Sequence, residues 1–189
     1  MKKKKNLLVL FAAMLCMKLS AQDLAIHNNI FWDVMGELSL GTEIALKPRT
    51  TVEIYGGVRP WKKTDDSVNK NWFVQGQYRF YTCQKYNGLY WGPYAHGGEF
   101  NMENADLPFG LLKGLKTSRY EGWFIGGGLG IGYEYPISKH WNLGAEIGAG
   151  YTYIDYKKFD CGTCGNLDKK DKYHYIGISK FGLNLIYLL

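Results

Sequence analysis

Residues 141–153 read Trp141-Asn142-Leu143-Gly144-Ala145-Glu146-Ile147-Gly148-Ala149-Gly150-Tyr151-Thr152-Tyr153. Every odd position is apolar or aromatic, and the even positions are Asn, Gly, Glu, Gly, Gly and Thr. Successive side chains of a β-strand point to opposite faces, so this alternation is typical of a strand with one apolar and one polar face. A helix would instead repeat its apolar residues every third or fourth position.

The same alternation recurs seven more times along the chain, and it predicts an all-β protein of eight strands. The predicted strands cover about Leu24–Met35, Glu37–Leu46, Thr51–Pro60, Asn71–Thr82, Leu89–Met102, Arg119–Tyr135, Trp141–Tyr153 and Lys172–Leu189.

The connections between these strands alternate in length. Short ones lie near Pro48, Tyr86–Asn87 and Pro136–His140, and longer polar or glycine-rich ones lie near residues 61–70, 103–118 and 157–171. The hairpin around Gly36 is the one departure from the rule. Short turns at one end and long loops at the other are typical of an up-and-down barrel of the outer membrane.

The two faces of the strands differ in bulk. The apolar faces carry large Trp, Tyr, Leu and Ile side chains, too bulky for eight strands to enclose in a small barrel. We therefore predict an eight-stranded antiparallel up-and-down transmembrane β-barrel with its apolar face outward and a polar network inside. The predicted network comprises Glu37, Glu43, Glu53, Arg59, Gln75, Gln77, Arg79, Glu99, Glu146 and Lys180. Alternation alone does not say which face is wet, so a soluble lipocalin-like barrel with the faces reversed stays an alternative.

The first 21 residues have the features of a secretory leader. Lys2 to Lys5 form a positive segment, Leu7 to Met17 an apolar one too short to span a bilayer, and we place cleavage before Gln22. Residues 1–21 are thus a predicted signal peptide, and residues 22–189 a single barrel domain in the cell outer membrane. Five of the 23 lysines and arginines lie in the leader, which leaves 18 against 17 acidic residues. This balance gives no reason to expect a nucleic-acid partner.

Three cysteines lie beyond the leader: Cys83, Cys161 and Cys164. Export favours a local disulfide between Cys161 and Cys164, with reduced thiols as the alternative. A redox pair would need a strand–helix–strand setting, and structural zinc would need four ligands, which these positions do not supply. Cys83 lies at a predicted short turn, out of reach of the other two.

The sequence supplies no clear catalytic set. The histidines are scattered, and His174 and Ser179 lie five positions apart on one strand, hence on opposite faces. We predict a non-enzymatic protein without a catalytic residue, cofactor or metal.

Several motifs together resemble one protein family. They are Arg119-Tyr120-Glu121-Gly122-Trp123, Ser138-Lys139-His140-Trp141-Asn142-Leu143, Tyr151-Thr152-Tyr153-Ile154-Asp155-Tyr156, Cys161-Gly162-Thr163-Cys164, Pro60-Trp61 and the terminal segment from Lys180 to Leu189. The set resembles an uncharacterised Bacteroidetes domain-of-unknown-function family of small exported proteins that look like outer-membrane barrels. The resemblance implies the envelope of an anaerobic Gram-negative bacterium and an accessory role near surface-fimbria gene clusters. It brings no catalytic residue.

These observations predict a membrane platform whose extracellular loops bind a surface partner, with outer-membrane lipid around the barrel and a fimbrial component as a candidate partner. Two alternatives remain: a lipid A-modifying or lipid-binding barrel, and a soluble periplasmic carrier with an apolar cavity.

Overall fold

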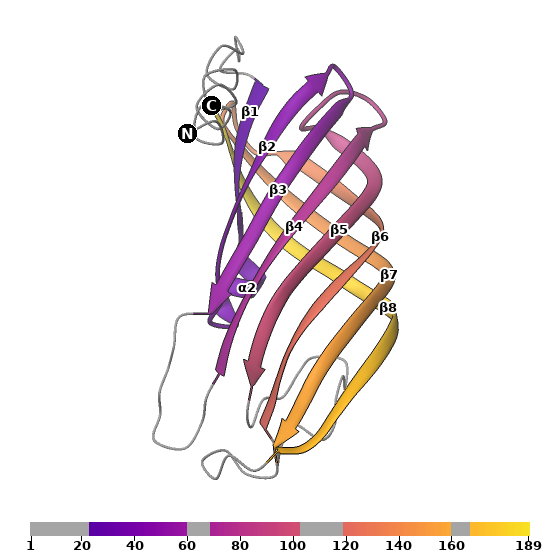
Figure 1. Cartoon of the computed structure of the whole chain (residues 1–189). Coiled ribbons are helices and arrows are strands. Elements are labelled where there is room, and N and C mark those ends of the chain that lie inside the picture. Colours follow the sequence, from indigo (N-terminus) through magenta and orange to yellow (C-terminus); the bar gives the residue numbers. More distant parts are fainter. Residues whose placement is uncertain (1–22, 60–68, 103–118, 160–166) are drawn as a thin grey trace, which may run out of the picture.

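The computed structural model describes residues 23–59, 69–102, 119–159 and 167–189. These residues form eight strands and one short helix (Figure 1). The elements are β1 (Leu24–Asn29), α2 (Ile30–Val34), β2 (Leu38–Lys47), β3 (Thr50–Arg59), β4 (Asn69–Tyr81), β5 (Gly88–Met102), β6 (Arg119–Pro136), β7 (Trp141–Phe159) and β8 (Leu167–Leu188).

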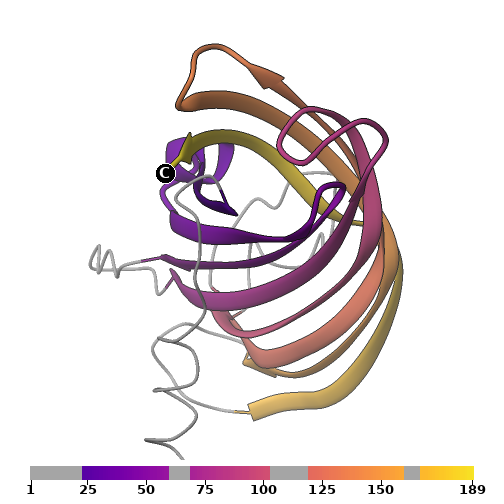
Figure 2. The ribbon, with the colours of Figure 1, turned by 90° about the horizontal axis from the view of Figure 1, so that it is seen from above.

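Each strand pairs antiparallel with its neighbour in sequence, and β1 pairs with β8, so that the sheet closes into a barrel. Figure 2 shows the ring from above. The prediction of eight antiparallel strands is confirmed. We call the end with the short β2–β3, β4–β5 and β6–β7 connections the turn end, and the opposite end the loop end.

The first predicted strand is wrong in its second half. β1 ends at Asn29, and residues 30–34 form α2. The Asn29 side chain caps the helix by accepting from the backbone N–H of Trp32 (3.4 Å), and Gly36 takes a positive φ of 85° after it. Apolar residues at 30, 32 and 34 continue the strand period, so this local capping is what separates helix from strand here. No helix in the described ranges is long and apolar enough to cross a membrane.

Because α2 occupies the β1–β2 connection, the hairpin around Gly36 is longer than predicted. The connection lies at the loop end, where β3, β5 and β7 also end (Figure 1). The alternation of short and long connections therefore holds around the whole ring.

The loop predicted over residues 157–171 is mostly strand. β7 continues to Phe159 and β8 begins at Leu167, with Lys157 opposite Lys170 and Tyr156 opposite Asp171. Both faces carry polar side chains in this stretch, so the hydrophobic alternation that indicates a strand fades while backbone pairing continues.

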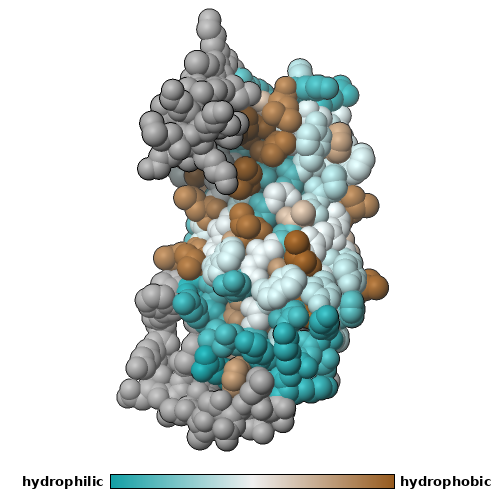
Figure 3. Space-filling model, viewed as in Figure 1, coloured by the Kyte–Doolittle hydropathy of each residue, from teal (hydrophilic) through white to brown (hydrophobic). Residues whose placement is uncertain are grey.

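Burial is divided in the reverse of the pattern typical of soluble proteins. Many charged and amide side chains are buried, whereas many large apolar side chains are exposed. Figure 3 shows brown apolar side chains over the middle of one face and hydrophilic ones gathered towards the loop end. The exposed apolar set includes Leu40, Ile54, Val74, Ile125, Leu129, Ile131, Ile147 and Leu183.

A small apolar cluster fills the turn end of the ring. Tyr86 folds back from the β4–β5 turn with a φ of 62°, and it packs with Ala25 and Ile186. Its hydroxyl donates to the carbonyl of Asp23 (2.8 Å), and its carbonyl accepts from Asn142 Nδ2 (2.7 Å). Tyr86 thus ties the turn to the first, seventh and last strands.

Candidate functional site

Arg79 on β4 is the centre of the ring's interior and is fully buried. Its Nη1 bonds to Glu43 and to Glu134 (3.4 Å), and its Nη2 bonds to Glu53 (2.5 Å) and Glu146 (3.2 Å). The four carboxylates come from β2, β6, β3 and β7. One guanidinium therefore joins five of the eight strands.

The remaining three strands add one group each. Lys180 of β8 bonds through Nζ to Glu146 (2.9 Å), His27 of β1 places Nε2 2.9 Å from Glu43, and the Tyr90 hydroxyl of β5 donates to Glu146 (2.9 Å). We call the whole set the charge cluster: His27, Glu43, Glu53, Gln77, Arg79, Tyr81, Tyr90, Glu134, Glu146 and Lys180.

The charge cluster combines four carboxyl groups with the guanidinium of Arg79 and the amino group of Lys180. Removing such groups from water is costly, and only close pairing with further hydrogen bonds offsets that cost. The pairing here is dense, because the Tyr81 hydroxyl lies within hydrogen-bond distance of both Glu43 (2.8 Å) and Glu134 (2.7 Å), while Gln77 accepts from Arg79 Nε (2.9 Å). The cluster fills the ring with side chains and braces all eight strands against one another.

His27, Glu43 and Glu134 could form a metal site by spacing alone, since one ligand atom from each lies within 4.8 Å of the others. Both carboxylates are already engaged by Arg79 and by the Tyr81 hydroxyl. A metal cation placed among them would face the guanidinium directly. The donor set therefore fits an internal ion-pair network better than it fits a metal.

Six of the ten residues predicted for the interior belong to the charge cluster: Glu43, Glu53, Gln77, Arg79, Glu146 and Lys180. Glu37 and Gln75 are also buried, outside it; Glu37 accepts from Asn71 Nδ2 (3.2 Å). Arg59 is half-buried at the loop end and donates to the Met35 carbonyl (2.8 Å).

The tenth prediction, Glu99, is wrong. Glu99 is exposed and accepts from Trp72 Nε1 (3.1 Å), which lies opposite it on β4. On β5 the buried positions are even, among them Tyr90 and Tyr94, so the period of two places residue 99 outside. The fifth strand carries Gly, Pro and Ala on its outer face, which obscured its phase in the sequence.

The sequence reasoning missed several members of the charge cluster, chiefly Glu134 and His27. A signal for Glu134 was present, because it continues the column of Gly128, Gly130 and Gly132 on the inner face of β6. His27 likewise alternates with Ile26, which lies on the exposed face.

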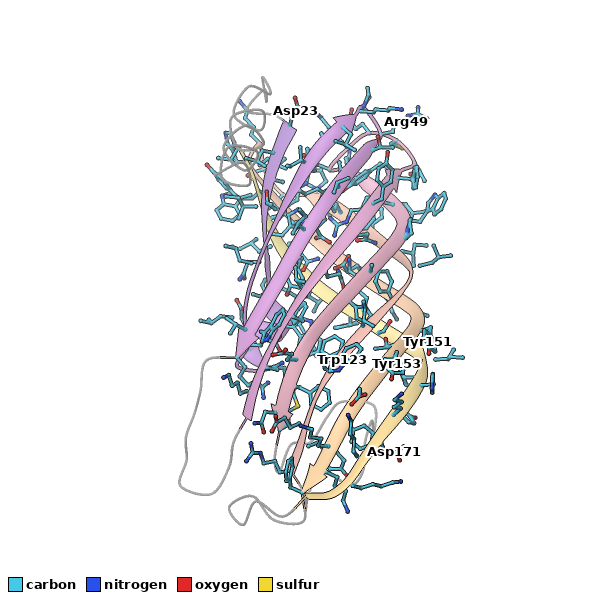
Figure 4. All side chains as sticks on the ribbon, viewed as in Figure 1. Asp23, Arg49, Trp123, Tyr151, Tyr153 and Asp171 are labelled. Atoms are coloured by element: carbon cyan, nitrogen blue, oxygen red, sulfur yellow. The ribbon has the colours of Figure 1, made fainter. Side chains whose placement is uncertain are left out.

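A second region of interest lies outside the ring, near the loop end of β6, β7 and β8. The Trp123 ring lies 5.5 Å from that of Tyr153, which lies 5.4 Å from His174. The Tyr151 hydroxyl lies 2.5 Å from His174 Nδ1. Figure 4 shows Trp123, Tyr151 and Tyr153 together, with Asp171 nearer the loop end.

The structure keeps His174 and Ser179 apart. His174 is exposed and contacts Tyr151 and Tyr153, whereas Ser179 Oγ lies 2.6 Å from the hydroxyl of the buried Tyr94. The two side chains have different partners on different faces, as the spacing predicted.

Several predictions fall outside the described residues: the signal peptide over residues 1–21, the Cys161–Cys164 disulfide, and most of the loops predicted near residues 61–70 and 103–118. Within the described part of the chain, Cys83 is a free and exposed thiol at the turn end.

A comparison with protein families matches residues 7–189 to a family described as "Protein of unknown function (DUF3575)". The chain belongs to this family. The match covers nearly the whole DUF3575 chain, including all eight strands and the charge cluster. No curated protein matches the chain.

Proposed function

We propose that this DUF3575 protein is a non-enzymatic, non-conducting barrel of the bacterial outer membrane that holds a binding surface for a partner outside the cell. The observation that carries the proposal is the reversed burial. A closed ring that buries Arg79 with four glutamates and exposes leucine, isoleucine and valine is stable where lipid, and not water, surrounds it.

The exposed aromatic side chains support a transmembrane placement. They form one row towards the turn end and one towards the loop end, with aliphatic residues between. On β6, eleven residues separate Trp123 from Tyr135, and on β7 nine separate Trp141 from Tyr151. A tilted strand needs about 9–11 residues to cross the hydrocarbon core, and aromatic side chains favour its two borders.

The charge cluster supports a barrel without a channel. An eight-stranded barrel is narrow enough for side chains to fill, and here the interior side chains are tied to one another by ion pairs. The same cluster argues against the soluble carrier, because an apolar ligand would have to replace buried charges. We therefore place the binding role at the loop end.

The polar part of the barrel wall beyond the aromatic row is the surface we assign to a partner. Lys157, Lys170 and Lys172 are exposed there. The motif resemblance is the reason we name a fimbrial component as the candidate partner in a Bacteroidetes cell envelope.

The first test is the gel mobility of the membrane-extracted protein with and without boiling, together with cell fractionation. A closed transmembrane barrel stays folded in cold detergent and migrates differently from the unfolded chain. We expect a mobility shift, with the protein in the outer-membrane fraction. A soluble protein without a mobility shift would mean that the exposed apolar face does not contact lipid, and it would contradict the proposal.

Two further measurements separate the alternatives. In planar bilayers we expect no stable conductance, because the interior is filled. In a deletion strain we expect unchanged lipid A, whereas a lipid A-modifying enzyme predicts a changed lipid. A loss of one lipid A species in the deletion strain, restored by the intact gene, would replace our proposal with the enzymatic one.

A further inference from the structure

The two edges of β8 are covered unequally. One edge pairs with β7 along almost its whole length, from Leu167 to Tyr187. The other edge pairs with β1 only from Leu188 to Asn184, because β1 has six residues and ends at Asn29. β8 therefore continues well past its partner towards the loop end (Figure 1).

α2 and its cap cover the next part of this edge. The backbone N–H of Leu183 donates to Asn29 Oδ1 (3.4 Å), and the Phe181 carbonyl accepts from Trp32 Nε1 (3.1 Å). The rings of Phe31 and Phe181 meet edge to face, with centroids 4.9 Å apart. Side chains thus replace a neighbouring strand as far as Phe181.

Beyond a bulge at Ser179, the edge continues from Ile178 to Lys170, and no strand among the described residues pairs with it. We call this stretch the open edge. Nine residues of strand span roughly 30 Å. A strand edge of this length presents a row of backbone donors and acceptors that can pair with another chain. Within this stretch the Lys172 N–H donates to Asp171 Oδ1 (2.9 Å) and the Ile178 carbonyl accepts from the Tyr175 hydroxyl (3.1 Å), so an added strand would pair with the remaining edge groups.

The open edge begins on the apolar side of the aromatic row. Ile176, 82% exposed, and Ile178, 42% exposed, lie turn-ward of His174 and have outward-facing neighbours on β7. In the hydrocarbon region an open sheet edge is not tolerated, because lipid tails cannot hydrogen-bond to the backbone. What covers this part must supply both backbone donors and acceptors, and a polypeptide strand does so.

The other half of the open edge is basic. Lys170 lies directly opposite Lys157 on the outer face, and both are exposed. Like charges directly opposite one another in a sheet are destabilising. The open edge is on the far side of Lys170, so an acidic residue on an added strand would lie beside it and offset this repulsion. Lys172, two residues on, is a second exposed cation, and Asp155 lies opposite it on β7.

We propose that the open edge receives an extended segment of a partner protein by strand addition, with apolar side chains beside Ile176 and Ile178 and acidic side chains beside Lys170 and Lys172. Backbone hydrogen bonds would provide the binding, and the side-chain pattern would select the segment. This inference rests on the proposed membrane function and names the chemistry of its partner.

A second copy of this chain fits the edge poorly. Two barrels in one membrane run their β8 strands in the same direction across it, each tilted by roughly 40° and in opposite senses at a two-fold axis. The two strands would then cross at about 80°, far from the near-alignment that a backbone ladder requires.

The test uses the full-length protein in nanodiscs and a labelled ten-residue synthetic peptide. The peptide alternates valine with threonine in one half and glutamate with threonine in the other. Fluorescence anisotropy measures binding, and hydrogen exchange followed by mass spectrometry measures protection of residues 170–178. We expect saturable binding and slower exchange at the open edge. A matched peptide with two central prolines should not bind, because proline cannot donate to a ladder.

Charge reversal gives the sharper comparison. The double substitution Lys170→Glu and Lys172→Glu should weaken binding of the glutamate peptide about tenfold, since each pair changes from attractive to repulsive. A lysine version of the peptide should regain the loss. Lys139→Glu, an exposed lysine at the turn end, serves as the control and should change neither affinity.

The outcomes separate this inference from the membrane function. A protein that shows the heat-dependent mobility shift but no saturable peptide binding overturns strand addition and leaves the barrel in place. A protein without the shift overturns both. A dimer of the protein alone, with residues 170–178 protected and the double substitution breaking it, would assign the edge to a second copy and overturn the peptide proposal.

Discussion

The two ends of this barrel differ in how the backbone groups at the strand edges find hydrogen-bond partners. Towards the turn end every strand has a neighbour on both sides, and the enclosed side chains bond to one another through the charge cluster. Towards the loop end β7 and β8 extend beyond the end of β1, and one edge of β8 has no strand partner there among the described residues. Closure thus makes the first region self-sufficient, whereas in the second the edge of β8 is the site of the strand addition that we propose.

Strand length is the physical origin of this difference. β1 has six residues and β8 has 22, so their pairing must stop where β1 turns into α2. We call the part of the barrel around the charge cluster the closed region, and the extension of β7 and β8 beyond β1 the open region. The comparison predicts that substitutions in the closed region change the stability of the protein strongly. Changes in the open region should alter partner binding with little effect on stability.

The largest effect is expected from Arg79→Met, which leaves four buried carboxylates without their shared cation. Removing one partner of a buried ion pair costs about 3–5 kcal/mol. The measurement is the urea concentration at which the folded band is lost on an unboiled gel. The control is Arg59→Met. Arg59 is half-buried at the loop end, and its replacement should lower the free energy of unfolding by about 1 kcal/mol or less. Equal losses from the two substitutions would contradict the contrast between the regions.

Gly92→Ala tests how tightly the closed wall is packed. A Cβ on Gly92 would lie 1.7 Å from the Tyr78 carbonyl oxygen, so β4 and β5 would have to move apart. Overpacking of this kind costs about 1–3 kcal/mol. Gly76→Ala on β4 is the control, because its Cβ would meet only the Glu53 carbonyl oxygen at 3.9 Å. If both variants unfold at the parental urea concentration, the wall is looser than described.

Two glutamates of the charge cluster should differ in importance. Glu43→Gln removes the closest carboxylate of Arg79 and of His27, and we expect a loss of about 1.5 kcal/mol. Glu134 lies farther from Arg79, at 3.4 Å, and the amide oxygen of a glutamine in its place can still accept from Tyr81. Glu134→Gln also relieves an excess of negative charge, so its loss should be smaller. The same urea titration measures both variants. A larger loss of stability from Glu134→Gln than from Glu43→Gln would contradict this ranking of the two glutamates.

The smallest effect on stability is expected from shortening the open region. Replacing residues 157–170 by Asn-Gly joins Tyr156 to Asp171, which lie opposite one another, through a two-residue turn. The pairs removed include exposed charges, so unfolding should shift by less than about 1 kcal/mol. Peptide binding at the open edge should weaken, because Lys170 is removed. A collapse of the folded band would show that the closed region depends on the extension.

The sequence predicted most strands to within a few residues, because one apolar face repeats with a period of two in most strands from β2 to β8, β5 being the least clear. The prediction of strand bounds failed where the alternation was absent or where it also fitted a helix. Around Ile30, Trp32 and Val34 an apolar spacing of two suits both a strand and a five-residue helix. Beyond Tyr153 the strand persists although its faces no longer differ in hydropathy.

The candidate site was predicted in part for the same reason. Face assignment alone places Glu43, Glu53 and Arg79 on one side of the sheet, but it does not state which carboxylate meets which cation. Glu99 was misplaced because its strand has a poorly marked phase, and Glu134 was missed among glycines.

By itself, the sequence determined the number of strands, their alternation of faces and the polar character of one face, since each depends on residues close together in the chain. The tertiary structure alone decided which groups converge on Arg79, because Glu43 and Glu146 lie 36 and 67 positions away and meet only through the register of the closed ring. It also decided that β8 is left with an open edge. That edge exists because two strands far apart in the sequence, β1 and β8, have unequal lengths where the ring closes.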